Sequence, residues 1–395
     1  MKKLILTLTV LLSFTGLSAQ DRAAMDSLQN IIDRAGEALV KKNYPTAACL
    51  YNEAITFANE HPDEAITPWR KKNTSAHCQY NLACIYSLTG KKQAALNAFK
   101  QALDAGYSNY KWALEDKDLK NIQGESYFKE LIRPLAEKYD YAAILKKGGK
   151  YSKSAKDAEL PAFTYLEVND PRLVHLRETL NLDSIAGHGD EISRIKNLCL
   201  WVHNTVRHDG SSDNPEQKNA LALIRICKEQ NRGVNCRMLA TILNECYLAM
   251  GFKSRFVTCL PKSEDDPDCH VVNVVWSRTL DKWIMADPSF YAFFTDKKGN
   301  LLGIAEARQM ILDGKTVKTN PEINWNGQPY GEAEHIDYMT KNFYWFSCPT
   351  RSTVDTESVD NRQNEDYLIL AAGDFKPWQN DYITRDADVF WARPE

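Results

Sequence analysis

Residues 233–257 read GVNCRMLATILNECYLAMGFKSRFV, and this stretch decides the fold that the sequence predicts. After the cysteine, apolar side chains recur at a helical period, at Leu239, Ile242, Leu243, Cys246 and Met250. Gly251 supplies a helix stop, and β-prone residues follow it. We therefore expect a helix over residues 236–250 with Cys236 in its first turn, and then a strand over residues 254–260.

Two more strands are expected downstream, over residues 270–276 and 282–286, because both segments are rich in Val, Ile and Trp. If they form a hairpin that turns at Arg278-Thr279, His270 and Asp287 lie directly opposite each other. Side chains paired in this way share one face of the sheet, with Cβ atoms about 4.5–5.5 Å apart. A register slip by an even number of residues keeps both on that face but staggers them.

Cys236, His270 and Asp287 are the residue types of a cysteine nucleophile, its base and the group that orients the base. The free N–H groups and the dipole of a helix N-terminus favour a thiolate at Cys236. An Asp beside His270 can accept a ring N–H, set the tautomer and stabilise imidazolium. Taken singly, a buried Cys, a strand His and an Asp-Pro turn are ordinary features. Their order and local contexts together predict a catalytic triad.

Four segments together resemble the core of the transglutaminase-like superfamily: residues 233–236 with the helix after them, 251–257, 269–276 and 283–288. The resemblance covers about residues 190–300 and implies a papain-like α+β domain with an antiparallel sheet. It makes Cys236 the nucleophile, His270 the base and Asp287 the orienting acid, and Gly251 and Arg255 also fit its pattern. Many members carry an acidic residue directly after the Cys, whereas Arg237 stands here, which affects the expected substrate preference and leaves the triad complete.

An acyl-transfer site also needs hydrogen-bond donors for the oxyanion. The backbone N–H of Cys236 is one candidate, and the side chain of Gln230 is the second. The competing interpretation of Gln230 is a solvated loop residue. We expect Gly233 to allow a tight turn before Cys236, and His203 and His208 to cap the preceding helix or face solvent.

The N-terminal part reads as helical hairpins over residues 27–105. One pattern of small and aromatic residues occurs twice at a constant offset, as Ala35, Ala47, Tyr51 and Ala54 and again as Ala83, Ala95, Phe99 and Ala102. The arrangement resembles tetratricopeptide repeats, with an inserted loop around residues 61–72 and a partial third hairpin at residues 112–135. Such a surface either binds a peptide or protein partner or only packs on itself and on the next domain.

The domain organisation begins with Lys2 and Lys3, an apolar run and small residues up to Ala19, which is the pattern of a signal peptide. The protein is therefore expected to be exported, to the periplasm or the medium. The expected segments are a signal peptide (1–19), a tetratricopeptide-like helical domain (20–140), a linker (141–160), the catalytic core (161–315) and a C-terminal extension that packs on the core (316–395).

The amino-acid composition excludes several classes of function. The net charge of -3, from 49 Lys and Arg against 52 Asp and Glu, gives no basic excess for nucleic-acid binding. No internal stretch approaches the ~18 apolar residues of a membrane span. No Cys-x-x-Cys pair occurs, so we expect no structural zinc site. We also expect no cofactor. The ten cysteines leave the question of disulfide pairing open.

Two functions remain after these exclusions. The first is an enzyme that forms a thioester on Cys236 with a peptide or protein substrate, as a peptidase or amidase rather than as a cross-linking transglutaminase. The second is a scaffold without catalysis, in which the helical repeats bind a protein or peptide. The complete triad favours the enzyme.

Overall fold

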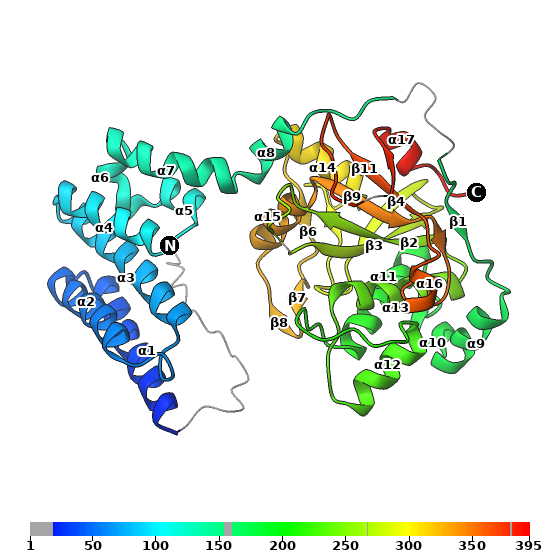
Figure 1. Ribbon diagram of the computed structural model, residues 1–395, viewed down its shortest axis with the longest axis horizontal. Helices are drawn as coiled ribbons and strands as arrows, with labels where there is room; N and C mark the ends of the chain where they lie inside the picture. Colours follow the sequence, from blue (N-terminus) through cyan, green and yellow to red (C-terminus); the bar gives the residue numbers. More distant parts are fainter. Residues whose placement is uncertain (1–18, 154–159, 267, 380) are drawn as a thin grey trace. The chain divides into compact units, whose positions relative to one another are not determined.

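The computed structural model describes residues 19–153, 160–266, 268–379 and 381–395 (Figure 1). The chain divides into two compact units, Met1–Asp140 and Tyr141–Glu395, and each is described by itself. The predicted signal peptide lies outside the described residues up to position 18, and so do residues 154–159 of the predicted linker. The helix that follows begins at Ala19.

The first unit consists of helices, and α1 to α4 pack in succession along the chain. Its elements are α1 (Ala19–Val40), α2 (Tyr44–Glu60), α3 (Pro68–Leu88), α4 (Lys92–Asp104), α5 (Tyr110–Glu115), η1 (Lys117–Leu119), α6 (Lys120–Gln123) and α7 (Ser126–Tyr139). Helix α3 begins inside the expected loop of residues 61–72. Thr67 caps it by accepting a hydrogen bond from the Arg70 N–H, and Pro68 stands at its start, so the loop spans only residues 61–67.

The repeated sequence pattern forms the core of this unit. All eight of its residues are buried, namely Ala35, Ala47, Tyr51, Ala54, Ala83, Ala95, Phe99 and Ala102. The small side chains allow close helix contacts, and the ring of Phe99 stacks on Phe128 with 4.8 Å between their centroids. The predicted N-terminal helical region is therefore present.

The second unit is built on one six-stranded sheet with the order β12-β11-β9-β2-β3-β4. Within this sheet only β11 and β12 pair in parallel, so the predicted α+β class with an antiparallel sheet is confirmed. The strands of this sheet are β2 (Ser254–Leu260), β3 (His270–Ser277), β4 (Lys282–Ala286), β9 (Trp345–Pro349), β11 (Tyr367–Ala371) and β12 (Tyr382–Thr384). Short two-stranded pairs are β1 (Thr164–Tyr165) with β10 (Arg351–Ser352), β5 (Phe294–Thr295) with β6 (Lys318–Thr319), and β7 (Asn324–Trp325) with β8 (Gln328–Pro329).

Helices cover both faces of the sheet (Figure 1). They are α8 (Tyr141–Lys147), α9 (Pro171–Leu180), α10 (Leu182–Ala186), α11 (Glu191–Thr205), α12 (Ala220–Glu229), α13 (Cys236–Ala249), α14 (Ile304–Leu312), α15 (Glu332–Asn342), α16 (Val359–Arg362) and α17 (Ala387–Phe390). Helix α13 packs on β2 and β3, with α9, α11 and α12 around it, whereas α14 and α15 contact the sheet from the core on its other side. Successive residues of β3 accordingly alternate, with Val275 in the first core and Val274 in the second.

Two segments take a larger part in this unit than the sequence suggested. Residues 316–395, expected to pack on the core as an extension, supply β9, β11 and β12, so half of the strands of the main sheet come from them. Residues 141–147 of the expected linker form α8, which packs on α14 and α15. Leu145 of α8 is buried in the hydrophobic core on that side of the sheet, which explains why this segment is helical.

The predicted register of the β3–β4 hairpin is wrong by two residues, because the prediction pairs Ser277 with Leu280. Ser277 pairs with Lys282, and the turn contains four residues, with Asp281 in the left-handed region at φ 51°. The carboxylate of Glu191 at the start of α11 accepts hydrogen bonds from the Arg278 and Thr279 N–H groups and from the Ser277 hydroxyl, and thereby holds this turn. The slip is even, so His270 and Asp287 still share a face but are staggered.

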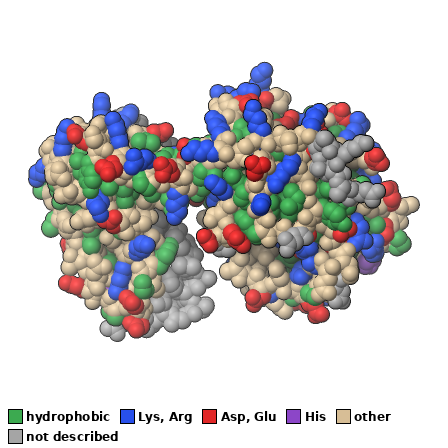
Figure 2. Space-filling view, turned by 45° about the horizontal axis from the view of Figure 1, so that its top comes forward, with side chains coloured by type: hydrophobic (Ala, Val, Ile, Leu, Met, Phe, Trp, Pro, Cys, Tyr) green, Lys and Arg blue, Asp and Glu red, His purple; other side chains and the backbone are tan. Residues whose placement is uncertain are grey.

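The face of the molecule displayed in Figure 2 shows no dominance of one charge. On the face displayed in Figure 2, Lys and Arg side chains are interspersed with Asp and Glu on both units. Among the helices of the described residues, none has the length and apolar character that a membrane crossing needs. All ten cysteines lie in the described part of the chain, and each carries a free thiol.

Candidate active site

Cys236 is the first residue of α13, as the sequence predicted. Asn235 caps the helix, because its side-chain oxygen accepts the Met238 N–H at 3.2 Å. The thiol therefore lies where free backbone N–H groups and the helix dipole favour negative charge. It is partly exposed, whereas Cys246 farther along the same helix is fully buried.

The segment before Cys236 lies against residues 207–209. The Val234 N–H donates to the Arg207 carbonyl at 3.0 Å, and the Asp209 N–H donates to the Val234 carbonyl at 2.8 Å. A Cβ on Gly233 would lie 2.6 Å from the Arg207 carbonyl oxygen. Glycine is required here by this close approach, because Gly233 is not among the residues with positive φ that a tight turn would demand. The contact brings His208 beside Cys236.

His270 and Asp287 form a buried pair behind the thiol. His270 is 2% exposed and donates from Nε2 to Asp287 Oδ2 at 2.8 Å, while Asp287 Oδ1 accepts the Ser289 N–H at 2.8 Å. Burial alone would lower the pKa of His270, but the Asp287 carboxylate holds it well above its usual value. The same pairing lowers the pKa of Asp287 against the opposing effect of burial. The pair therefore favours imidazolium and carboxylate.

The Cys236 thiol is surrounded by hydrogen-bond donors. Burial raises its pKa, but hydrogen bonds from His208 and His270, the charge of His270 and the N–H of Val271 together lower the pKa to about 6. Because Nε2 of His270 is bound to Asp287, its Nδ1 is the ring nitrogen left for Cys236. The structure thus brings the three predicted residues together, in surroundings that favour a thiolate, an imidazolium and a carboxylate.

His208 and His203 differ from their expected roles. His208 neither caps a helix nor merely faces solvent, because it hydrogen-bonds Cys236 and accepts the Trp325 indole N–H at Nδ1 at 3.0 Å. His203 is buried and links the Pro288 carbonyl at 2.9 Å to the Asn324 side chain at 2.8 Å. No local pattern in the sequence marks either histidine, because their partners are distant along the chain.

Gln230, the second oxyanion candidate, is the exposed residue that follows α12. None of the contacts found among the described residues joins its side chain to Cys236. The Cys236 N–H retains its predicted place at the helix start.

On the face of the sheet opposite α13, the His270–Asp287 pair is covered by α15 and by the ring of Phe290. The Tyr338 ring lies 5.3 Å from the His270 ring, and that of Phe290 lies 5.6 Å from it, between centroids. His335, which the sequence analysis did not single out, is buried with its Nε2 3.8 Å from Asp287 Oδ2. Burial lowers the pKa of His335 to about 4, so His335 is neutral at pH 7. The Asp287 carboxylate is therefore neutralised by His270 and not by His335.

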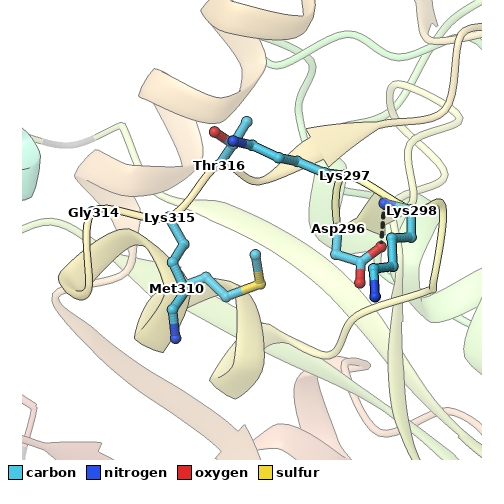
Figure 3. Close-up of a pocket in the computed structure, with 7 residues that line it drawn as sticks. All are labelled: Asp296, Lys297, Lys298, Met310, Gly314, Lys315 and Thr316. Carbon is cyan, nitrogen blue, oxygen red and sulfur yellow. Dashed lines mark hydrogen bonds between the residues drawn. The ribbon is translucent and has the colours of Figure 1, made fainter.

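Other candidate sites offer no comparable chemistry. A pocket of about 370 Å³ lies between Met310 and the loops at residues 296–298 and 314–316, and its lining contains no member of the triad (Figure 3). Across residues 19–153, 160–266, 268–379 and 381–395, no three His, Cys, Asp or Glu side chains are grouped so that they could hold a metal ion.

Part of the chain is similar to a known protein family. The family model of the transglutaminase-like superfamily matches residues 178–288, which include Cys236, His270 and Asp287. The chain therefore carries a transglutaminase-like domain.

Two individual proteins show more limited similarity. A chloroplastic protein of Arabidopsis thaliana is 35% identical over 60 residues, which are 15% of this chain and 18% of that protein. The alignment thus spans less than a fifth of the length of that relative. A crystal structure of a candidate cysteine protease from Cytophaga hutchinsonii shares 17% identity, with 40% of this chain and 54% of that chain covered. Its TM-score of 0.25 is too low to support an argument about fold or function.

Proposed function

We propose that this protein is a thiol enzyme that transfers acyl groups from amide bonds through a thioester on Cys236. The observation that carries the proposal is the Cys236 thiol at the start of α13 beside His270, with Asp287 bound to the far ring nitrogen of His270 at 2.8 Å. A thiol with a pKa of about 6 is mostly ionised at pH 7, which a nucleophile needs and a buried structural cysteine does not. The intact triad speaks against a scaffold without catalysis.

In the proposed acylation, Cys236 Sγ attacks the amide carbonyl carbon. The C–S bond forms while the carbonyl π electrons move onto oxygen. As the tetrahedral intermediate collapses, the C–N bond breaks and the leaving amine takes the proton from His270 Nδ1. Asp287 holds the ring and stabilises its charged form before this transfer.

Deacylation decides the type of enzyme. Water that gives a proton to His270 hydrolyses the thioester, and the protein is then a peptidase or amidase. An amine in place of water makes it a transglutaminase. The resemblance stated from the sequence favours hydrolysis of a peptide or protein substrate. The helical hairpins offer a surface that could recruit such a substrate or a protein partner, and the basic and apolar N-terminus supports export.

The proposal is tested by locating the reactive thiol in the full chain. A Cys49→Ser background removes the exposed Cys49 thiol. Brief treatment with iodoacetamide at pH 6.5 should modify Cys236 first, and p-nitrophenyl acetate should release one nitrophenolate per chain and leave an acetyl group on Cys236. The Cys236→Ala variant should give neither product, with acylation reduced by at least about 10⁴-fold.

Peptide mass mapping reads the outcome. Modification of Cys246 or Cys259 ahead of Cys236 would contradict the site. An absence of acylation in the wild type, with a normal melting curve, would contradict the enzyme. A library of peptides and amides then separates hydrolysis from transfer, with and without an added primary amine.

A further inference from the structure

We propose that the Nε2–H of His208 is the side-chain donor of the oxyanion hole, with the Cys236 backbone N–H as the second donor. This inference rests on the proposed thioester chemistry and gives a catalytic role to a residue outside the triad. It replaces Gln230, which is exposed at the end of α12.

The Trp325 indole fixes the tautomer of His208. An indole nitrogen can only donate, so the 3.0 Å bond from Trp325 Nε1 makes His208 Nδ1 an acceptor. The ring proton of the neutral imidazole must then lie on Nε2, the nitrogen left to face Cys236. His270 has the opposite arrangement, because its distal nitrogen donates to the Asp287 carboxylate. His270 can therefore exchange a proton with Cys236 or the substrate, whereas His208 retains its Nε2 proton as a hydrogen-bond donor.

A short hairpin holds His208 in this position. Strands β7 and β8 are joined by Asn326-Gly327, whose φ values of 51° and 79° are those of a two-residue primed turn. Asn326 fixes the backbone of His208 from both sides, since its Oδ1 accepts the His208 N–H at 2.8 Å and its Nδ2 donates to the His208 carbonyl at 3.0 Å. With the indole bond, three hydrogen bonds from one hairpin converge on a single residue.

The position of His208 suits the charge that develops during attack. Before attack the negative charge is on Sγ, and His208 lowers the pKa of Cys236 by hydrogen bonding to it. When the C–S bond forms, sulfur becomes neutral and the charge moves to the former carbonyl oxygen, which is bonded to the carbon attached to Sγ. A fixed N–H beside the sulfur loses its acceptor at that moment and can donate to the oxyanion without reorganising the site.

The experiment separates stabilisation of the thiolate from stabilisation of the oxyanion. Acylation by p-nitrophenyl acetate passes through an oxyanion, whereas displacement on iodoacetamide does not. Both second-order rate constants are measured at pH 9 on the full chain in the Cys49→Ser background. His208→Ala should lower acylation about 10²–10³-fold. Alkylation should stay within about threefold, the change expected if the thiol pKa moves by about one unit.

Two further variants serve as controls. His208→Gln keeps an N–H near the position of Nε2 and should recover most of the lost acylation. Trp325→Phe keeps an aromatic ring but removes the indole N–H, and it alters a half-exposed side chain, so it tests the proposal even if His208→Ala does not fold. It should lower acylation about tenfold, less than the loss of a whole oxyanion donor.

Equal losses of acylation and alkylation in the folded His208→Ala variant would overturn the inference, and so would no loss of either. In the Trp325→Phe variant, unchanged acylation would likewise overturn it. If instead the wild type is alkylated at Cys236 but never acylated, the proposed function itself fails. The failure of the inference and the failure of the proposed function are therefore distinguishable.

Discussion

Both units of the protein place cysteines on well-packed helices, yet the two environments give opposite chemistry. In α3 of the helical unit, burial raises the pKa of Cys78 to about 12. The neighbouring Cys84 has its pKa raised well above the usual value by burial and by the carboxylate of Asp116, which lies 3.6 Å from its sulfur. At the start of α13, by contrast, the pKa of Cys236 falls to about 6.

The difference lies in the position along the helix and in the sign of the neighbours, because burial acts in the same direction in both units. Cys78 and Cys84 lie within α3, where backbone N–H groups are already paired, and Cys84 faces an anion. Cys236 lies at a helix start and is surrounded by donors, of which His270 is charged. A helix start and a cationic partner each favour the thiolate of a cysteine, and Cys236 has both.

Among the changes that test the difference between Cys236 and the cysteines of α3, we expect Asp287→Asn to have the largest effect. The amide keeps the size of the side chain but cannot stabilise the His270 imidazolium, so acylation of Cys236 by p-nitrophenyl acetate should fall about 10²–10⁴-fold at pH 7. The thiol pKa should rise toward that of an ordinary cysteine, because the charge of His270 helps to lower it. The pH dependence of alkylation measures this shift. A variant that acylates at the wild-type rate would show that Asp287 does not orient the base.

The pH dependence of the wild type gives an intermediate effect. The pKa of Cys236 lies below that of an ordinary thiol, so its anion is present above pH 6 and is lost as the pH falls through this value. Alkylation should drop about tenfold per pH unit below pH 6 and level off above it. Cleavage of an amide substrate should also fall at alkaline pH, where His270 loses the proton needed by the leaving amine. An acid limb near pH 8.5 instead would contradict the thiolate–imidazolium pair.

The smallest effect on the site is expected from changes in the helical unit. Cys84→Ala removes a thiol from α3, and Phe99→Ala removes a fully buried ring that stacks on Phe128. Phe99→Ala should destabilise the helical unit by about 3–5 kcal/mol, measured by denaturant unfolding. Both variants should leave the rate of Cys236 alkylation within about twofold, because neither residue contributes to its surroundings.

Several secondary-structure elements around the site were predicted correctly from the sequence. The strands at residues 254–260 and 282–286 have the predicted bounds, and α13 begins at Cys236 as predicted. These segments obey local rules, namely a helical apolar stripe, a glycine stop and β-prone runs. The register of the β3–β4 hairpin was not readable, because Glu191 fixes its turn from a helix more than 80 residues away.

The sequence by itself determined the order Cys236, His270 and Asp287, the helix that begins at the cysteine, the strand that begins at His270 and the strand that ends just before Asp287. Only the tertiary structure decided what surrounds the thiolate. His208 reaches Cys236 because residues 207–209 pair with the segment around Gly233, and Trp325 reaches His208 from 117 positions along the chain. The helix and strand preferences of a segment depend on residues that are neighbours in the sequence, whereas the electrostatics of a site depend on groups that only folding brings together.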